Sequence, residues 1–205
     1  KGTVYYLSAG YLNTQGLVEN TGAKVGDIRL NLSQRLTRKL DLTFNFSSGY
    51  QENNMTSGTE PLGTAQASMI QQLVYAQPFL YPKRDDNNEE ALWANPISWI
   101  NDYADISKEL RFQGNLSLSY KISPTFTYRL NLAGSNRNKD RARWYGPTTY
   151  QGGLSNGQLG VGNMNRTFYS GESLLMFRKT NKKHQFNGTV GVTYNHDYLM
   201  NTAYL

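Results

Sequence analysis

The chain has 205 residues, a formal net charge of +6 and no cysteine. The lack of cysteine excludes disulfides, thiolate metal sites and a cysteine nucleophile. The mean hydropathy is negative, and no apolar run approaches the roughly 18 residues that a membrane-spanning helix needs. Because the Lys and Arg residues are scattered over predicted turns and loops, the positive charge does not indicate a nucleic-acid partner.

The first predicted strand already shows the bias toward tyrosine that marks the whole composition. Hydrophobic residues make up only 38% of the chain, whereas aromatic residues make up 13%, and tyrosine supplies most of these. This balance is unusual for a compact soluble core. It is ordinary for a transmembrane β-barrel, because only alternate residues meet lipid and aromatic side chains occupy the two membrane interfaces.

The strands themselves are predicted from segments that alternate an apolar residue with Asn, Ser or Arg. Such alternation runs through residues 29–33, 43–47, 115–119 and 129–133. A soluble sheet usually places Lys, Glu and Thr on its wet face, whereas here that face carries mostly amides and hydroxyls. The pattern is typical of a barrel whose polar face lines an aqueous or plugged lumen. We predict that the lumen-facing residues include Arg29, Asn31, Asn45, Arg111, Asn115, Arg129 and Asn131.

We therefore predict an all-β fold in which this chain supplies seven strands of an antiparallel transmembrane β-barrel. The predicted strands cover residues 3–12, 27–36, 40–51, 110–122, 126–136, 166–179 and 185–195. Short turns join the second strand to the third, the fourth to the fifth and the sixth to the seventh. The remaining connections are long, which is typical of outer-membrane barrels with periplasmic turns and extracellular loops.

The phase of the alternation is supported by the placement of aromatic residues. The outward row of the fourth strand runs from Phe112 to Tyr120, so aromatic residues stand at both ends of an apolar stretch. The sixth strand fits least well, because Glu172 shares a face with Phe168, Leu174 and Met176.

A family resemblance rests on residues 5–17, on Asn20-Thr21 and on residues 29–32. Together they resemble the early barrel of the SusC/RagA family of TonB-dependent outer-membrane transporters. Later segments agree in order, with residues 40–50 as the next strand and a long loop that contains Asn95-Pro96. The resemblance runs along most of the chain and is strongest in the first fifty residues.

The resemblance implies the fold and function of the whole transporter. It implies a barrel of about 22 strands, a plug domain and a SusD-like surface lipoprotein that covers the extracellular mouth. It also implies import of an oligosaccharide or peptide ligand, driven by the TonB complex, across the outer-membrane lipid of a Gram-negative, Bacteroidetes-like cell. The plug, the TonB box and the last strands are not found among these residues, and Lys1 and Gly2 directly precede a strand, so we expect a piece of a longer protein.

Six aromatic residues in the predicted extracellular loops are candidates for ligand binding. They are Trp93, Trp99, Tyr103, Trp144, Tyr145 and Tyr150. Their rings could stack on sugars or hold peptide side chains. The alternative is that they seat the loops against one another or against the partner lipoprotein.

The longest loop offers two further features. Residues 64–76 are predicted to form a short helix whose apolar stripe packs on the barrel rim or, alternatively, contacts the lipoprotein or the ligand. The acidic run at residues 84–90 lacks the spacing of a known calcium loop, so no metal site is predicted.

His184 and His196 have no acidic or thiol residue beside them at the spacing of metal ligands. No catalytic motif is found, so neither an enzyme nor a cofactor is expected.

Two other classes of protein are open alternatives. The first is a soluble or surface-attached β-rich module that binds carbohydrate or acts as an adhesin. The second is a passive porin, which shares the barrel but lacks a plug. A barrel needs detergent and shows heat-dependent mobility on gels, whereas a soluble module would be monodisperse in buffer.

The aromatic hypothesis makes a prediction for the intact transporter. Replacing Trp144 and Tyr145 by alanine is expected to weaken ligand binding while the barrel still assembles, because stacking surface is lost. Calorimetry measures the affinity, and an unchanged value would remove both residues from the site.

Overall fold

The computed structural model describes residues 2–55, 100–153, 155–181 and 184–204. Seven strands account for most of them. They are β1 (Thr3–Gln15), β2 (Gly22–Arg35), β3 (Leu40–Asn54), β4 (Tyr103–Lys121), β5 (Phe126–Tyr145), β6 (Gln158–Asn181) and β7 (His184–Tyr204). A single helical turn, α4 (Tyr150–Gly153), lies between β5 and β6.

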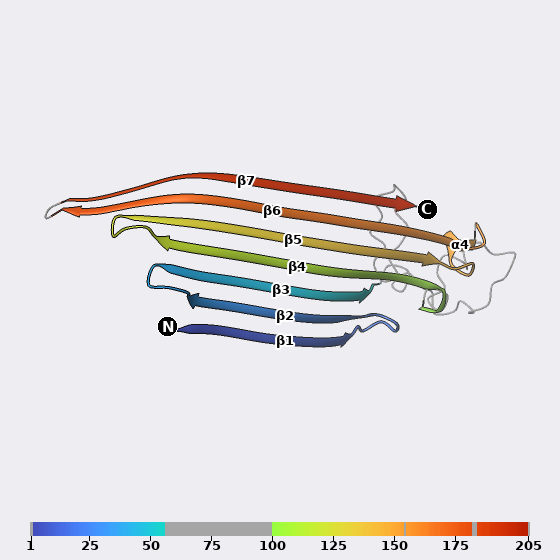
Figure 1. Cartoon of the computed structure of the whole chain (residues 1–205). Coiled ribbons are helices and arrows are strands. Elements are labelled where there is room, and N and C mark those ends of the chain that lie inside the picture. Colours follow the sequence, from blue (N-terminus) through green and yellow to red (C-terminus); the bar gives the residue numbers. More distant parts are fainter. Residues whose placement is uncertain (1, 56–99, 154, 182–183, 205) are drawn as a thin grey trace.

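The strands form one sheet in which each strand pairs antiparallel with the next in chain order. Figure 1 shows them side by side in a twisted single layer, with the short connections at one end and the longer ones at the other. We call these the turn end and the loop end. The predicted all-β fold with seven antiparallel strands is confirmed. The barrel of about 22 strands remains a prediction, because the structure describes seven strands of one sheet. The helix predicted at residues 64–76 lies outside the described residues. In the part of the chain that the structure describes, no helix is long and apolar enough to cross a bilayer.

The strand boundaries agree with the prediction at the turn end and differ at the loop end. At the turn end the differences are at most two residues, but β4 begins at Tyr103 instead of 110 and β5 continues to Tyr145 instead of 136. Likewise, β6 begins at Gln158 instead of 166. Beyond the apolar stretch, both faces of β5 carry polar residues such as Asn136, Asn138 and Asp140, so the alternation of apolar and polar residues that reveals a strand in the sequence is lost there. The backbone ladder continues there because its hydrogen bonds do not depend on side-chain polarity.

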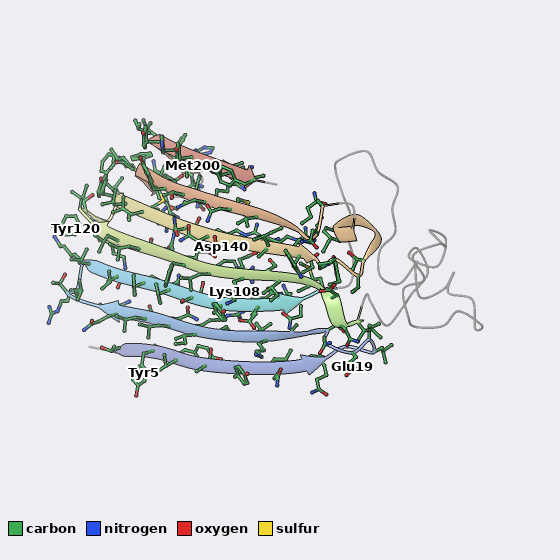
Figure 2. The ribbon with its side chains drawn as sticks, turned by 90° about the vertical axis from the view of Figure 1, so that its right-hand side faces the viewer. Tyr5, Glu19, Lys108, Tyr120, Asp140 and Met200 are labelled. Carbon is green, nitrogen blue, oxygen red and sulfur yellow. The ribbon has the colours of Figure 1, made fainter. Side chains whose placement is uncertain are left out.

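The pairing register sorts the side chains onto two faces, because residues directly opposite each other in an antiparallel pair share a face. One row crosses all seven strands through Tyr5, Leu32, Phe44, Leu116, Leu132, Gly171 and Tyr194. The neighbouring residues make a second row on the other side, through Tyr6, Asn31, Asn45, Asn115, Ala133, Ser170 and Asn195. We call these sides the apolar face and the polar face. Figure 2 shows side chains standing off both.

The register also places the sixth strand, whose pattern was the least regular. Glu172 lies opposite Asn131 and accepts a hydrogen bond of 2.7 Å from its amide. Because Ser117 donates to the same Asn131 at 2.6 Å, Glu172 belongs to a polar network across three strands. The even-numbered residues of β6 therefore lie on the polar face, while Leu175 and Phe177 lie on the apolar one.

The apolar face has no second layer over it in the described residues. Tyr5, Val190 and Val192 are 75%, 76% and 74% exposed, and among the described residues the buried apolar core is the pair Tyr103 and Tyr145 at the loop end. A β-sandwich would instead bury such a face against a second sheet. The arrangement suits a sheet whose apolar side meets hydrocarbon.

A charged residue in the middle of the apolar face is predicted to be costly. Replacing Leu116 by arginine in the intact protein is expected to destabilise it in lipid vesicles by about 2–4 kcal/mol, because the guanidinium must enter hydrocarbon. Asn115→Arg is the matched control, since its side chain lies on the polar face of the same strand. Denaturant unfolding in vesicles measures the difference, and equal effects of the two changes would contradict the assignment of the faces.

Candidate functional site

The seven residues predicted to face the lumen all lie on the polar face. A hollow of about 400 Å³ opens over this face, and it is lined mainly by Arg29, Asn31, Asn45, Ser47, Gln113 and Asn115. The lining of this hollow consists mainly of amide, hydroxyl and guanidinium groups. That this face lines a lumen remains a prediction.

Two of the six aromatic candidates come together at the loop end of the polar face. Tyr103 and Tyr145 lie opposite each other, their ring centroids are 5.2 Å apart, and each is 8% exposed. Val18 and Ile100 pack against the pair. Burial raises the pKa of both tyrosine hydroxyls, so they stay neutral. This packing matches the alternative that these rings seat the loops.

The remaining aromatic candidates are placed differently. Trp144 lies on the apolar-face side, is 37% exposed, and packs over Gly157. Gly157 has a φ of +111°, and a Cβ there would lie 2.5 Å from the Trp144 ring, so the loop needs glycine at this position. The backbone of Tyr150 forms the start of α4. Trp93 and Trp99 lie outside the described residues, and ligand binding by these aromatics remains a prediction.

A buried carboxylate holds the strand ends under the tyrosine pair. Asp105 is 2% exposed. Arg141 donates one hydrogen bond to each carboxylate oxygen of Asp105, and the bond from Nε is 2.7 Å long. Arg143 approaches the same carboxylate at 3.5 Å, and the Tyr103 hydroxyl donates to it at 3.4 Å. The bond to Asp105 raises the pKa of Arg141. We call Tyr103, Asp105, Arg141, Arg143 and Tyr145 the outer cluster.

Hydrogen bonds join three loops to one another around the outer cluster. The Met55 amide donates to the Asp105 carbonyl at 2.9 Å, and the Asn20 side chain donates to the Ile100 carbonyl at 3.1 Å. The carboxylate of Asp102 accepts bonds from the backbone and hydroxyl of Thr148 at 2.9 and 2.7 Å. The β1–β2 loop, the end of the β3–β4 connection and the β5–β6 loop are therefore held together around one charged centre.

Three arginines stand side by side on the polar face below the outer cluster. Arg111 of β4 lies opposite Arg137 of β5, which lies opposite Arg166 of β6, and we call these residues the arginine row. Glu109 accepts two bonds of 2.9 Å from Arg137 and contacts Arg111 at 3.1 Å. Asp197 accepts two hydrogen bonds from Arg166, and the bond from Nε is 3.0 Å long. The bonds from Arg137 hold the pKa of Glu109 below its usual range.

Sequence reasoning found only Arg111 of this row. Residues 137–165 were predicted to be a loop, so Arg137 had no assigned face, and Arg166 was the first residue of a predicted strand. A signal was present: Arg137, Lys139, Arg141 and Arg143 recur at every second position. Such spacing on an extended strand places all four cations on one face.

In the described ranges, no group of His, Asp or Glu side chains has an arrangement that could hold a metal ion. The acidic run at residues 84–90 lies outside these ranges.

The sequence is similar to that of a curated receptor. No family model matches the chain. The TonB-dependent receptor P26 of Formosa agariphila is 26% identical over 140 residues. This match covers 68% of the chain but only 14% of the relative, so the chain spans about a seventh of that protein's length.

Solved structures show the same fold. The RagAB peptide importer in its closed-closed state and the RagAB peptide transporter match with TM-scores of 0.71 and 0.72 at 15% identity, over 99% of this chain and 24% of theirs. The predicted resemblance is confirmed: the chain is SusC/RagA-like and matches part of a TonB-dependent receptor. The ferric-catecholate import receptor Fiu of E. coli K12 matches with a TM-score of 0.59 at 11% identity, over 96% of this chain and 30% of that one.

The outer cluster makes a stability prediction. Replacing Asp105 by asparagine is expected to weaken the local structure by about 2 kcal/mol, because the partly exposed guanidinium of Arg141 loses its buried, charged acceptor. Hydrogen exchange of the amides around residues 102–107 and 141–149 measures the change. Asp140→Asn, an exposed change on β5, is the control, and equal protection in both variants would show that the cluster does not hold the loops.

Proposed function

We propose that the chain is part of the wall of an outer-membrane transporter that imports a nutrient in a TonB-dependent manner. The observation that carries this proposal is the separation of one sheet into an uncovered apolar face and an amide-rich polar face. The similarity to a TonB-dependent receptor in sequence and to RagAB and Fiu in fold supports the same conclusion. In this proposal the apolar face meets outer-membrane lipid and the polar face meets the lumen.

The loop end would face the outside of the cell, since long connections of such barrels are extracellular. A ligand would bind at the loops and the upper polar face, and force from the TonB complex on a plug domain would open a path along the polar face. The polar face suits this path because its Asn, Ser and Arg side chains exchange hydrogen bonds with a hydrated ligand.

The ligand class and partner of the transporter follow as further parts of the proposal. Oligosaccharides and peptides are the two ligand classes, and the fold similarity to the RagAB peptide importer supports peptides. A SusD-like lipoprotein would cover the extracellular mouth and contact the loops that the outer cluster joins. Purification of the tagged transporter from its own membranes should then also recover a surface lipoprotein.

A soluble carbohydrate-binding module fits the structure less well. Such a module would carry its apolar residues inside, whereas Tyr5, Leu7, Val190 and Val192 lie on an uncovered face of a single layer. Burying that many exposed apolar side chains in lipid is favourable by about 25 cal/mol for each Å² removed from water.

Energy coupling provides the functional test. Cells that make the intact protein are expected to take up its nutrient only while the TonB complex is present, and to bind it at the surface in either case. Labelled-ligand uptake in cells with and without TonB measures this difference. Uptake that persists without TonB would indicate a passive porin, and a protein that stays monodisperse without detergent would indicate a soluble module.

A further inference from the structure

The arginine row is an unusual arrangement for a sheet. Cβ atoms of directly opposite residues lie about 5 Å apart, and like charges at such positions destabilise strand pairing. Here Arg111, Arg137 and Arg166 occupy three consecutive strands at one level, so the repulsion occurs twice. Such an arrangement needs a compensating negative charge.

The described residues compensate the row only in part. Glu109 and Asp197 supply two carboxylates for three guanidinium groups. Lys139 lies opposite Glu109 on the same face and adds a fourth positive charge. The side chains of Arg111, Arg137 and Arg166 are 53%, 45% and 53% exposed. The row therefore presents an excess of positive charge to the space in front of the polar face.

The space in front of the row is a hollow of about 430 Å³, lined by the three arginines together with Gln113, Ser135 and Phe168, among others. Guanidinium groups donate in a planar fork that matches a carboxylate. Gln113 and Ser135 add amide and hydroxyl groups, and Phe168 adds an aromatic ring on the same face. The lining of the hollow thus combines positive charge, polar groups and an apolar ring.

We propose that the arginine row binds a carboxylate of the imported ligand and that this ligand is an acidic peptide. The proposal rests on the proposed import function. A peptide matches the mixed lining, because its backbone amides can pair with Gln113 and Ser135 while an apolar side chain packs on Phe168. The row lies on the loop-end side of the apolar stretch, directly below the outer cluster, where an entering ligand would arrive.

The experiment measures peptide binding to the intact transporter in detergent by calorimetry. The probes are a peptide containing several glutamates, the same peptide with glutamine in their place, and an oligosaccharide of uronic acid. Arg111→Gln is the test variant, because it removes the excess charge and leaves the paired bonds between Glu109 and Arg137 in place. It is expected to weaken binding of the glutamate peptide about tenfold and to leave the glutamine peptide nearly unchanged.

Two further variants distinguish ligand binding by the arginine row from a structural role. Arg178→Gln makes the same charge change on the polar face of β6 but near the turn end, and it should leave all affinities unchanged. Glu109→Gln removes the carboxylate that competes for Arg111 and Arg137, so it should strengthen binding of the glutamate peptide by about threefold to tenfold. A merely structural role of the row would make both Arg111→Gln and Glu109→Gln weaken every probe alike.

The outcomes separate this inference from the import function. Equal affinity of the wild type for the two peptides, or an effect of Arg111→Gln on both, overturns the arginine row as a carboxylate site. Charge-dependent binding of the uronic acid oligosaccharide alone overturns the peptide assignment. If wild-type cells take up none of these probes or any other peptide or oligosaccharide, the import function itself fails.

Discussion

The backbone hydrogen-bond register between neighbouring strands is the constraint on which the rest of this structure depends. A peptide group left without a partner in hydrocarbon costs several kcal/mol, so a membrane strand must pair along its length. The same register decides which residues share a face, and a slip of one residue would exchange the two faces completely. The row from Tyr5 to Tyr194 and the adjacent polar row show that all seven strands keep one consistent phase.

At the loop end a different interaction takes over. Beyond the apolar stretch, charged pairs join neighbouring strands. Asp105 with Arg141 and Glu109 with Arg137 are short, paired contacts between β4 and β5. The tyrosine pair Tyr103 and Tyr145 closes over them. These paired contacts join the loops at their base, and ordering of this kind lowers the entropy cost of forming ligand contacts.

Stability and recognition are separated along the polar face. The outer cluster is buried and internally paired, so its residues serve the position of the loops. The arginine row is half-exposed and carries more positive than negative charge, so its residues suit contact with a ligand. Opposed like charges reduce sheet stability, and proteins keep such local conflicts mainly where function requires them.

The sequence by itself determined the all-β class, the seven strands, their turn-end boundaries and the face of residues such as Asn31 and Asn115, because apolar and polar residues alternate there with a period of two. It did not determine the strand extensions to Tyr145 and from Gln158, because Asn136, Asn138 and Asp140 put polar residues on both faces of β5 and glycines interrupt the start of β6. Only the tertiary structure decided that Arg111, Arg137 and Arg166 lie opposite one another on three neighbouring strands, and that Tyr103 and Tyr145 are buried against each other. These contacts join segments far apart in the chain, and their alignment depends on pairing that no local pattern encodes.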